Sequence, residues 1–256
     1  MPASVKLQEQ YGDDVQVLFV ECQNTPQDVY EAFAWKMKWM GNGAMWTAER
    51  PISTKGSGLP ETAVLGIDGT VLLQGHPGDF GKKLEETIAA EIKKSKQPPA
   101  GTPKELEKAW TSFLKGDVAA AFAECDKLGS DDAKAAKAEF SARTFGRIER
   151  AKRMLESGDV TEADALAAKL AKSVKGVAEL ETKLAELTTK LASADVGAER
   201  DADKAFDSFT NDVAKKKPFE PGSVKRAEGL AKKHAGTKNG KRFERFVALA
   251  KIDLNK

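Results

Sequence analysis

The sequence is poor in the residues that build metal and redox sites. Its 256 residues include two cysteines, Cys22 and Cys125, and two histidines, His76 and His234. Because the two cysteines stand far apart along the chain, they give neither a disulfide framework nor the spacing of a metal-ligand cluster. We therefore predict no metal site, no cofactor and no catalytic residue.

Long apolar stretches are also lacking. No stretch approaches the roughly 20 apolar residues that a membrane-spanning helix needs, and no apolar signal region follows Met1 and Pro2. The sequence therefore predicts no membrane span and, by default, a cytoplasmic location. A location in the cell envelope or outside the cell is expected only if an upstream segment carries an export signal.

A marked net charge is missing as well, since 41 Lys and Arg residues stand against 39 Asp and Glu residues. The residues up to Ser95 include 9 basic and 13 acidic side chains, which leaves 32 basic and 26 acidic side chains in the remainder. Such an excess on a Lys-rich helical region is typical of solvated helix faces. The basic runs Lys215–Lys217 and Lys232–Lys233 lack the interleaved exposed aromatic residues of a single-strand groove. We predict no nucleic-acid partner.

One proline-rich segment divides the chain. Lys96–Pro103 contains three prolines and one glycine, which disfavour regular structure and make a stiff spacer. Strand and helix patterns alternate before it, and only helical patterns follow it. We predict an α/β domain over residues 1–94, a Pro-rich linker over 95–103 and an all-helical domain over 104–256.

Hydrophobic periodicity and turn residues predict the order helix, strand, helix, strand, strand, helix in the first domain. The apolar, β-branched run Val15–Glu21 is typical of a strand covered on both faces, and Asp68-Gly69 is a strong hairpin signal. The expected elements are a helix ending at Tyr11, a strand at Val15–Glu21, a helix from Thr25-Pro26 to about Met40, a loop over 41–58, hairpin strands at Thr62–Ile67 and Thr70–Gln74, and a helix at Asp79–Lys94.

This order, with the motif Gly58-Leu-Pro-Glu-Thr62 directly before the hairpin, resembles the rear part of the thioredoxin fold, especially in bacterial thiol–disulfide reductases. The family has a cis-proline at this place, and Pro60 matches it. A cis X–Pro bond costs only about 0.5–1 kcal/mol relative to trans. In the family it turns the backbone N–H and C=O of the preceding residue toward a bound peptide. The alternative is a trans peptide in an ordinary turn.

The resemblance implies a peptide-binding surface made of Leu59, Pro60 and Trp46. Trp46 belongs to a group of tryptophans and methionines that the family packs beside its active-site groove. Exposed aromatic and Met side chains suit an apolar partner. The alternative is that this group covers one face of the sheet. Its members are Trp35, Met37, Trp39, Met40, Met45 and Trp46.

The redox-active Cys-x-x-Cys of the family is absent from this chain. By the resemblance, Pro2 matches the proline that kinks the active-site helix, so the cysteine pair and the central strand of the sheet belong before Met1. We therefore expect an N-terminally truncated domain in which the strands at Val15–Glu21 and Thr62–Ile67 have no partner between them. We expect an upstream segment or another chain to complete the sheet.

Cys22 is the one candidate for a substitute redox thiol. It has no second cysteine, helix N-terminus, His or Lys beside it to lower its pKa, so we interpret it as a small, buried or half-buried side chain. Cys125, in the middle of a predicted helix, is interpreted in the same way, and His76 is expected in an exposed loop.

An internal repeat marks the helical domain. Gly116–Leu128 and Gly158–Leu170 share Gly, Asp, Val, two alanines, Lys and Leu at a constant offset of 42 residues, and a weaker third copy begins at Val224. Repeats of this kind resemble tetratricopeptide-type helical hairpins, in which a Gly-Asp turn ends one helix and begins the next. The full consensus is not present. We expect the leucine stripe of residues 177–191 to pack within a hairpin, and five phenylalanines to supply the core of the last helices: Phe206, Phe209, Phe219, Phe243 and Phe246.

Two functions follow as hypotheses. The first is a thioredoxin-like protein of the thiol–disulfide oxidoreductase family. Its chemistry needs a low-pKa thiolate and a resolving thiol, and this chain has no such pair, so we expect it to be redox-inactive. The alternative is a non-catalytic module that binds a protein or peptide through the thioredoxin-like platform and the helical repeats. A purely structural role is the third hypothesis.

Overall fold

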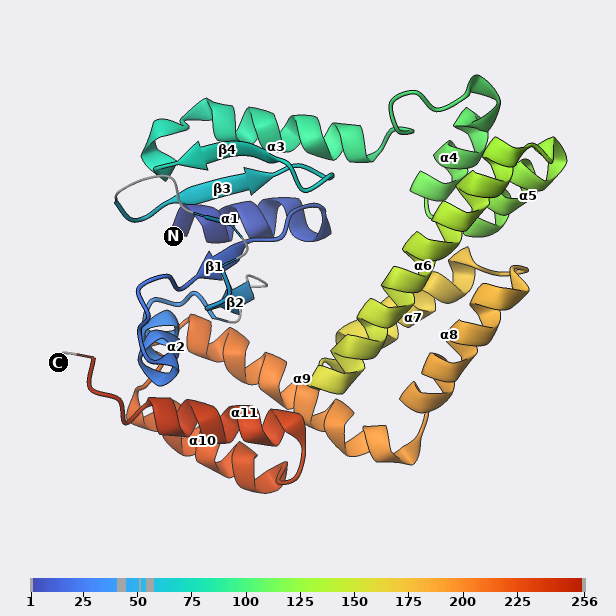
Figure 1. Ribbon diagram of the computed structural model, residues 1–256. Coiled ribbons are helices and arrows are strands. Elements are labelled where there is room, and N and C mark those ends of the chain that lie inside the picture. The colour runs from blue at the N-terminus through green and yellow to red at the C-terminus, as the bar shows by residue number, and fades with distance from the viewer. Residues whose placement is uncertain (1, 41–44, 51, 54–57, 255–256) are drawn as a thin grey trace.

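The computed structural model describes residues 2–40, 45–50, 52–53 and 58–254. It confirms the coarse fold class, an α/β region followed by an all-α region (Figure 1). Among the described residues there are eleven α-helices and four short strands. The segment between residues 96 and 103 contains no helix or strand, as its prolines predict.

The α/β region follows the predicted order, with one strand added. The helix α1 is followed by β1, and α2 is followed by a new strand, β2. The hairpin β3–β4 and the helix α3 then complete the region. Their bounds are α1 Pro2–Tyr11, β1 Leu18–Val20, α2 Gln27–Lys36, β2 Met45–Thr47, β3 Thr62–Leu65, β4 Val71–Gly75 and α3 Lys82–Ser95.

The strands form two separate two-stranded sheets in the described part of the chain. β1 and β2 pair in parallel, with Phe19 opposite Trp46. β3 and β4 pair antiparallel, with Val64 opposite Leu73 and a bulge between Val64 and Leu65. In Figure 1 the hairpin and the parallel pair lie on opposite sides of α1, with β3 and β1 as the inner strands.

Three predicted elements need correction. The expected loop over 41–58 contains β2, because its backbone pairs with β1. β1 covers only the middle of the expected strand, since its partner offers three residues and the N–H of Val17 donates instead to Gln8 Oε1 at 2.7 Å. The helix α2 ends at Lys36, because Lys38 takes a left-handed conformation with φ of 58°.

The N-terminal cap of α2 is also different from the expected one. Pro26, and not Thr25, occupies the cap position, and no side chain caps the helix there. The hairpin, by contrast, forms as predicted: Gly66 N–H donates to the Thr70 carbonyl at 2.8 Å, and Gly69 has a φ of 81°, which favours glycine.

The all-α region packs consecutive helices against one another. Both copies of the Gly-Asp-Val motif end one helix and begin the next, and both Gly116 and Gly158 have positive φ. In the first copy, Asp117 accepts a hydrogen bond from Ala120 N–H. The bounds are α4 Glu107–Leu114, α5 Val118–Leu128, α6 Asp131–Ser157, α7 Val160–Ser173, α8 Ala178–Leu191, α9 Ala194–Ala214, α10 Pro221–Lys233 and α11 Lys238–Leu249.

Three hydrophobic cores stabilise this region. One joins α4, α5 and α6 around Trp110 and Phe140. The next joins α6, α7 and α8 and contains the leucine stripe, which confirms packing within the chain: Leu180, Leu184, Leu187 and Leu191. The last contains the five predicted phenylalanines and joins α9, α10 and α11: Phe206, Phe209, Phe219, Phe243 and Phe246.

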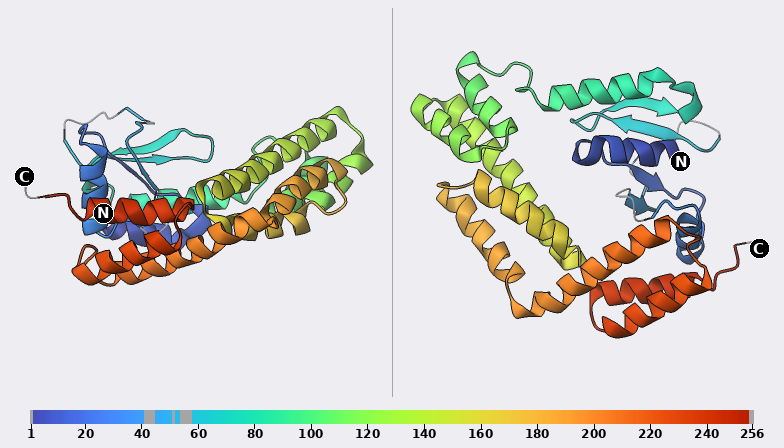
Figure 2. Two further views of the ribbon diagram at one scale, coloured as in Figure 1. Left: turned by 90° about the horizontal axis from the view of Figure 1, so that it is seen from below. Right: turned by 180° about the vertical axis from the view of Figure 1, so that it is seen from behind.

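The last core also includes a helix of the α/β region. The views of Figure 2 show the chain curving round from α4 until α10 and α11 return to α2. Ala32 and Trp35 of α2 are buried in this core, and the Trp35 and Phe246 rings meet edge to face with centroids 5.0 Å apart. Glu31 also accepts a hydrogen bond from Arg245 Nε at 2.7 Å. The two ends of the chain are therefore joined by apolar and ionic contacts.

A polar junction around the buried Asn239 fixes the N-terminus of α11. The Glu199 carboxylate of α9 accepts hydrogen bonds from the backbone N–H groups of Lys238 and Asn239, at 2.8 and 3.0 Å. The fully buried Asn239 side chain donates to the Gly158 carbonyl at 2.9 Å. Because the first N–H groups of a helix have no partner within it, Glu199 supplies an acceptor for two of them. None of the described helices is long and apolar enough to cross a membrane.

Replacing the Glu199 side chain is expected to destabilise the protein. The variant Glu199→Ala leaves the N–H groups of Lys238 and Asn239 without this acceptor, and we expect a loss of about 2 kcal/mol in the free energy of unfolding in urea. The matched control is Glu186→Ala on α8, whose exposed carboxylate lies 3.4 Å from Lys183; its expected loss is below about 0.5 kcal/mol. Equal stabilities of the two variants would contradict the role of the junction.

Candidate functional site

The Leu59–Pro60 turn is presented to solvent directly before β3. The Leu59–Pro60 peptide bond is cis, which confirms the expectation for Pro60. The Leu59 side chain is 52% exposed. Among the described residues, the backbone N–H of Leu59 donates no hydrogen bond and its C=O accepts none. At this turn an apolar side chain and two backbone polar groups are therefore exposed without a partner among the described residues.

The third residue of the predicted surface, Trp46, lies in β2. Its backbone pairs with Phe19 of β1, but its side chain lies outside what the structure describes. Of the other aromatic residues, Trp39 stacks on Phe19 with ring centroids 5.6 Å apart, as expected for a residue that covers a strand. Trp35 does not cover the sheet, because it packs on Phe246 in the helical core.

The edge of β1 that faces away from β2 is open. Alternate residues of a parallel strand direct their N–H and C=O groups to opposite sides. Glu21 N–H donates to the Thr47 carbonyl at 2.9 Å, so Phe19 and Glu21 point toward β2. The polar backbone groups of Leu18 and Val20 then point the other way, where none of the described residues bonds to them.

The edge of β3 that faces away from β4 is open in the same manner. Gly66 N–H bonds to the Thr70 carbonyl of the hairpin turn, so the alternating residues Thr62 and Val64 also point toward β4. The N–H and C=O groups of Ala63 and Leu65 point away from β4, and no hydrogen bond to them occurs within the described ranges. β1 and β3 are therefore the inner strands of two separate sheets, each with one edge unpaired among the described residues, and Figure 1 draws α1 between them.

Exposed apolar side chains gather in the α/β region. Among the described residues, ten large hydrophobic side chains are exposed, and nine of them precede residue 73. Six belong to or adjoin the two edge strands and the hairpin: Leu18, Val20, Leu65, Ile67, Val71 and Leu72. A strand pattern of the kind at Val15–Glu21 usually indicates burial on both faces, so this exposure shows apolar surface that the described chain does not cover.

Sequence reasoning did not single out these side chains as functional. Their signal was nevertheless in the sequence, since a strand with an apolar run such as Val17–Val20 predicts a covering layer on each face. The sequence pattern predicts that Leu18 and Val20 are buried, whereas both are exposed in the structure. This contrast singles out β1 as part of the candidate site.

The two thiols are not arranged for exchange chemistry. Cys22 follows β1, is half-buried and free, and its carbonyl accepts a hydrogen bond from Arg50 Nη2 at 2.6 Å. Cys125 lies in α5 with 1% exposure, and burial raises the pKa of its thiol. The interpretation of both cysteines as buried or half-buried side chains is confirmed. His76 is exposed at the start of a short 3-10 turn, where its Nδ1 accepts from Gly78 N–H at 3.1 Å.

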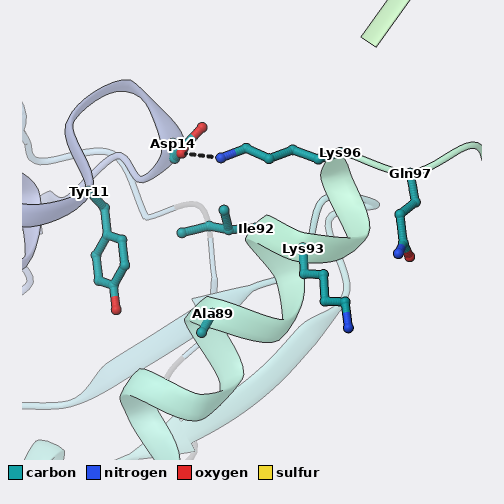
Figure 3. Close-up of a pocket in the computed structure, with 7 residues that line it drawn as sticks. All are labelled: Tyr11, Asp14, Ala89, Ile92, Lys93, Lys96 and Gln97. Atoms are coloured by element: carbon teal, nitrogen blue, oxygen red, sulfur yellow. Dashed lines mark hydrogen bonds and ion pairs between the residues drawn. The ribbon is translucent and has the colours of Figure 1, made fainter. Parts of the chain in front are cut away.

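A shallow hollow lies where the C-terminal ends of α1 and α3 approach each other (Figure 3). Ala89 and Ile92 of α3 form its apolar part, and Lys96 Nζ lies 2.8 Å from Asp14 Oδ2 at its rim. The ion pair ties the two helices together at this end. Within the described ranges, no group of three or more His, Cys, Asp or Glu residues is placed to hold a metal ion.

Comparisons of this chain with protein-family models, with curated proteins and with solved structures found no match.

The thiol geometry predicts that this chain does not reduce disulfides. A mixed disulfide formed at Cys22 has no neighbouring cysteine in the sequence to resolve it. In an insulin-reduction assay with dithiothreitol, we expect the chain and its Cys22→Ser variant to give the rate of dithiothreitol alone. A faster rate that Cys22→Ser abolishes would contradict this interpretation.

Proposed function

We propose that this chain is a non-catalytic protein-binding module, in which a thioredoxin-like α/β region binds an extended protein segment at the Leu59–Pro60 turn. The observation that carries the proposal is the exposure of Leu59, with its backbone N–H and C=O unbonded among the described residues, directly before β3. Extended segments bind to such backbone groups as an added strand, and pockets for side chains give specificity.

The thioredoxin-like part of the proposal rests on the order of elements and on the hairpin motif. The helix α1, strand β1, helix α2, hairpin β3–β4 and helix α3 follow one another in the order expected for the rear part of that fold, with β2 added between α2 and the hairpin. The cis-proline stands at the place expected from the resemblance. Membership of the thiol–disulfide oxidoreductase family is part of this proposal, with a redox-inactive chain, because its two thiols form no exchange pair.

We propose a supporting role for the helical region, as a tetratricopeptide-like scaffold. The two Gly-Asp-Val turns at residues 116–118 and 158–160 have similar backbone geometry. Its last helices also hold α2 through Trp35 and Phe246. Through α2, this contact joins the helical region to the α/β region that carries the turn.

Changing the exposed leucine of the turn is expected to weaken binding. The probe is fluorescently labelled α-lactalbumin that has been reduced and carboxymethylated, which is a soluble unfolded chain. For Leu59→Asp we expect at least fivefold weaker binding by fluorescence anisotropy, because a carboxylate replaces an apolar contact.

The matched control is Leu128→Asp, which changes an exposed leucine at the end of α5, far from the turn in sequence. We expect this variant to bind within twofold of the unchanged chain. Equal affinity of Leu59→Asp and the unchanged chain, or equal weakening in both variants, would contradict binding at the turn.

A further inference from the structure

We propose that an arginine face of α6, made of Arg143, Gly146, Arg147 and Arg150, binds an acidic helix of a partner protein. This surface lies in the helical region and not at the Leu59–Pro60 turn, so the inference goes beyond the proposed function and does not depend on it. The four residues are spaced at i, i+3, i+4 and i+7 within α6. Because residues with this spacing lie on one side of a helix, they form one continuous surface.

Positive charge gathers around the arginine face. Residues 143–153 include five basic side chains and one acidic side chain, Glu149. The carboxylate of Glu149 lies 3.8 Å from the ammonium group of Lys152. Among the described residues, no carboxylate forms an ion pair or a hydrogen bond with Arg147 or Arg150. The charges of these two guanidinium groups are therefore uncompensated within the described part of the chain.

Arg147 is the residue that most strongly favours an anionic ligand. Its side chain is partly buried, and burial together with the like charge of Arg150 lowers the pKa of its guanidinium. Charged side chains that are withdrawn from water are usually paired, because a counter-charge offsets the free energy of desolvation. A carboxylate beside Arg147 supplies that counter-charge and forms two parallel hydrogen bonds with the planar guanidinium.

Arg143 is held in place at one end of the arginine face. Its guanidinium pairs with Glu139, which lies one turn earlier in α6, and its Cζ lies 5.1 Å from the centroid of the Trp110 ring. A guanidinium has five N–H donors, so Arg143 keeps donors for a second carboxylate. Because its position is already fixed, binding orders fewer side-chain rotamers.

Gly146 favours a helix as the form of the partner. Beyond the adjoining backbone of α6, no atom lies within 4 Å of the place that a Cβ would take at Gly146. Glycine inside a helix lowers its stability relative to alanine, and it lets another backbone approach closely. The surface of α6 is therefore open to a second helix at the centre of the arginine face.

The spacing of the arginines matches the spacing of acidic residues on such a helix. With a rise of about 1.5 Å per residue, Arg143 and Arg147 are separated by about 6 Å along the axis, and Arg147 and Arg150 by about 4.5 Å. Asp or Glu residues at i, i+4 and i+7 of a partner helix have the same separations. One acidic helix face therefore pairs with all three guanidinium groups.

The charge of the whole chain favours a protein partner over a nucleic acid. The sequence has 41 Lys and Arg residues against 39 Asp and Glu residues, whereas a nucleic-acid-binding domain is usually basic overall and carries an extended basic surface. The arginine face spans only about two turns of one helix. We therefore infer an acidic protein segment as its ligand.

The test measures binding of the full chain to a labelled, alanine-based helix by fluorescence anisotropy. The peptide has about 20 residues, so that it is helical, with Glu at i, i+4, i+7 and i+11. We expect Arg147→Gln and Arg150→Gln each to weaken binding at least fivefold, because each removes the guanidinium that pairs with a carboxylate. The matched control, Lys152→Gln, removes one charge from another side of α6 and is expected to bind within twofold of the unchanged chain.

The variant Gly146→Leu separates binding from folding. A leucine covers the open backbone at the centre of the arginine face, so we expect at least fivefold weaker binding of the acidic peptide. The midpoint of urea unfolding is expected to rise, because leucine favours a helix more than glycine does. A purely structural role of this face would leave the affinity for the peptide unchanged.

Three results in this assay would overturn the inference. One is equal binding of a control peptide in which Gln replaces every Glu. Another is unchanged affinity in Arg147→Gln, Arg150→Gln and Gly146→Leu. The third is equal weakening by Lys152→Gln, which would show a general effect of charge and no defined face.

Two further measurements distinguish the occupants of the arginine face. If a DNA oligonucleotide displaces the peptide at a lower concentration than unlabelled peptide does, the ligand is a nucleic acid and the inference is wrong. It is also wrong if sedimentation shows a dimer of this chain that Arg147→Gln dissociates. We expect Leu59→Asp to bind the acidic peptide within twofold of the unchanged chain, so failure of binding at the turn and failure of binding at the arginine face are separate results.

Discussion

Backbone hydrogen bonding in the α/β region is the constraint on which the rest of the structure depends. Each of its two inner strands, β1 and β3, is paired on one side only within the described part of the chain. The outward backbone groups of Leu18, Val20, Ala63 and Leu65 therefore have no hydrogen-bond partner among the described residues.

The α/β region also packs against the helical region. None of the three hydrophobic cores consists of α/β residues alone. The α2 residues Ala32 and Trp35 are buried in the core of α9, α10 and α11, and Glu31 pairs with Arg245 beside them. In the helical region, Glu199 of α9 and Asn239 of α11 form a polar junction with Gly158 at the end of α6.

Local signals predicted much of this fold. The leucine stripe of α8, the Gly-Asp turns before α5 and α7, the hairpin at Gly69 and the proline-rich segment are each encoded within a few residues, so the sequence is enough to find them. The cis peptide at Pro60 was expected from a motif of similar length. β2 could not be found in this way, because Met45–Thr47 is a strand only through its pairing with β1. The contact of Trp35 with Phe246 joins residues from opposite ends of the chain, and nothing in the local pattern of α2 specifies it. The sequence therefore predicted the turn at Leu59 but not the apolar exposure of Leu18 and Val20.

Residue-resolved amide hydrogen exchange of the free protein tests the central claim most directly. If the two edges are open, the amides of Leu18, Val20, Ala63 and Leu65 exchange at least tenfold faster than those of Phe19, Glu21 and Val64, whose N–H groups point into the existing ladders. Equal protection of the two sets would show that the edges are already paired and would contradict the account.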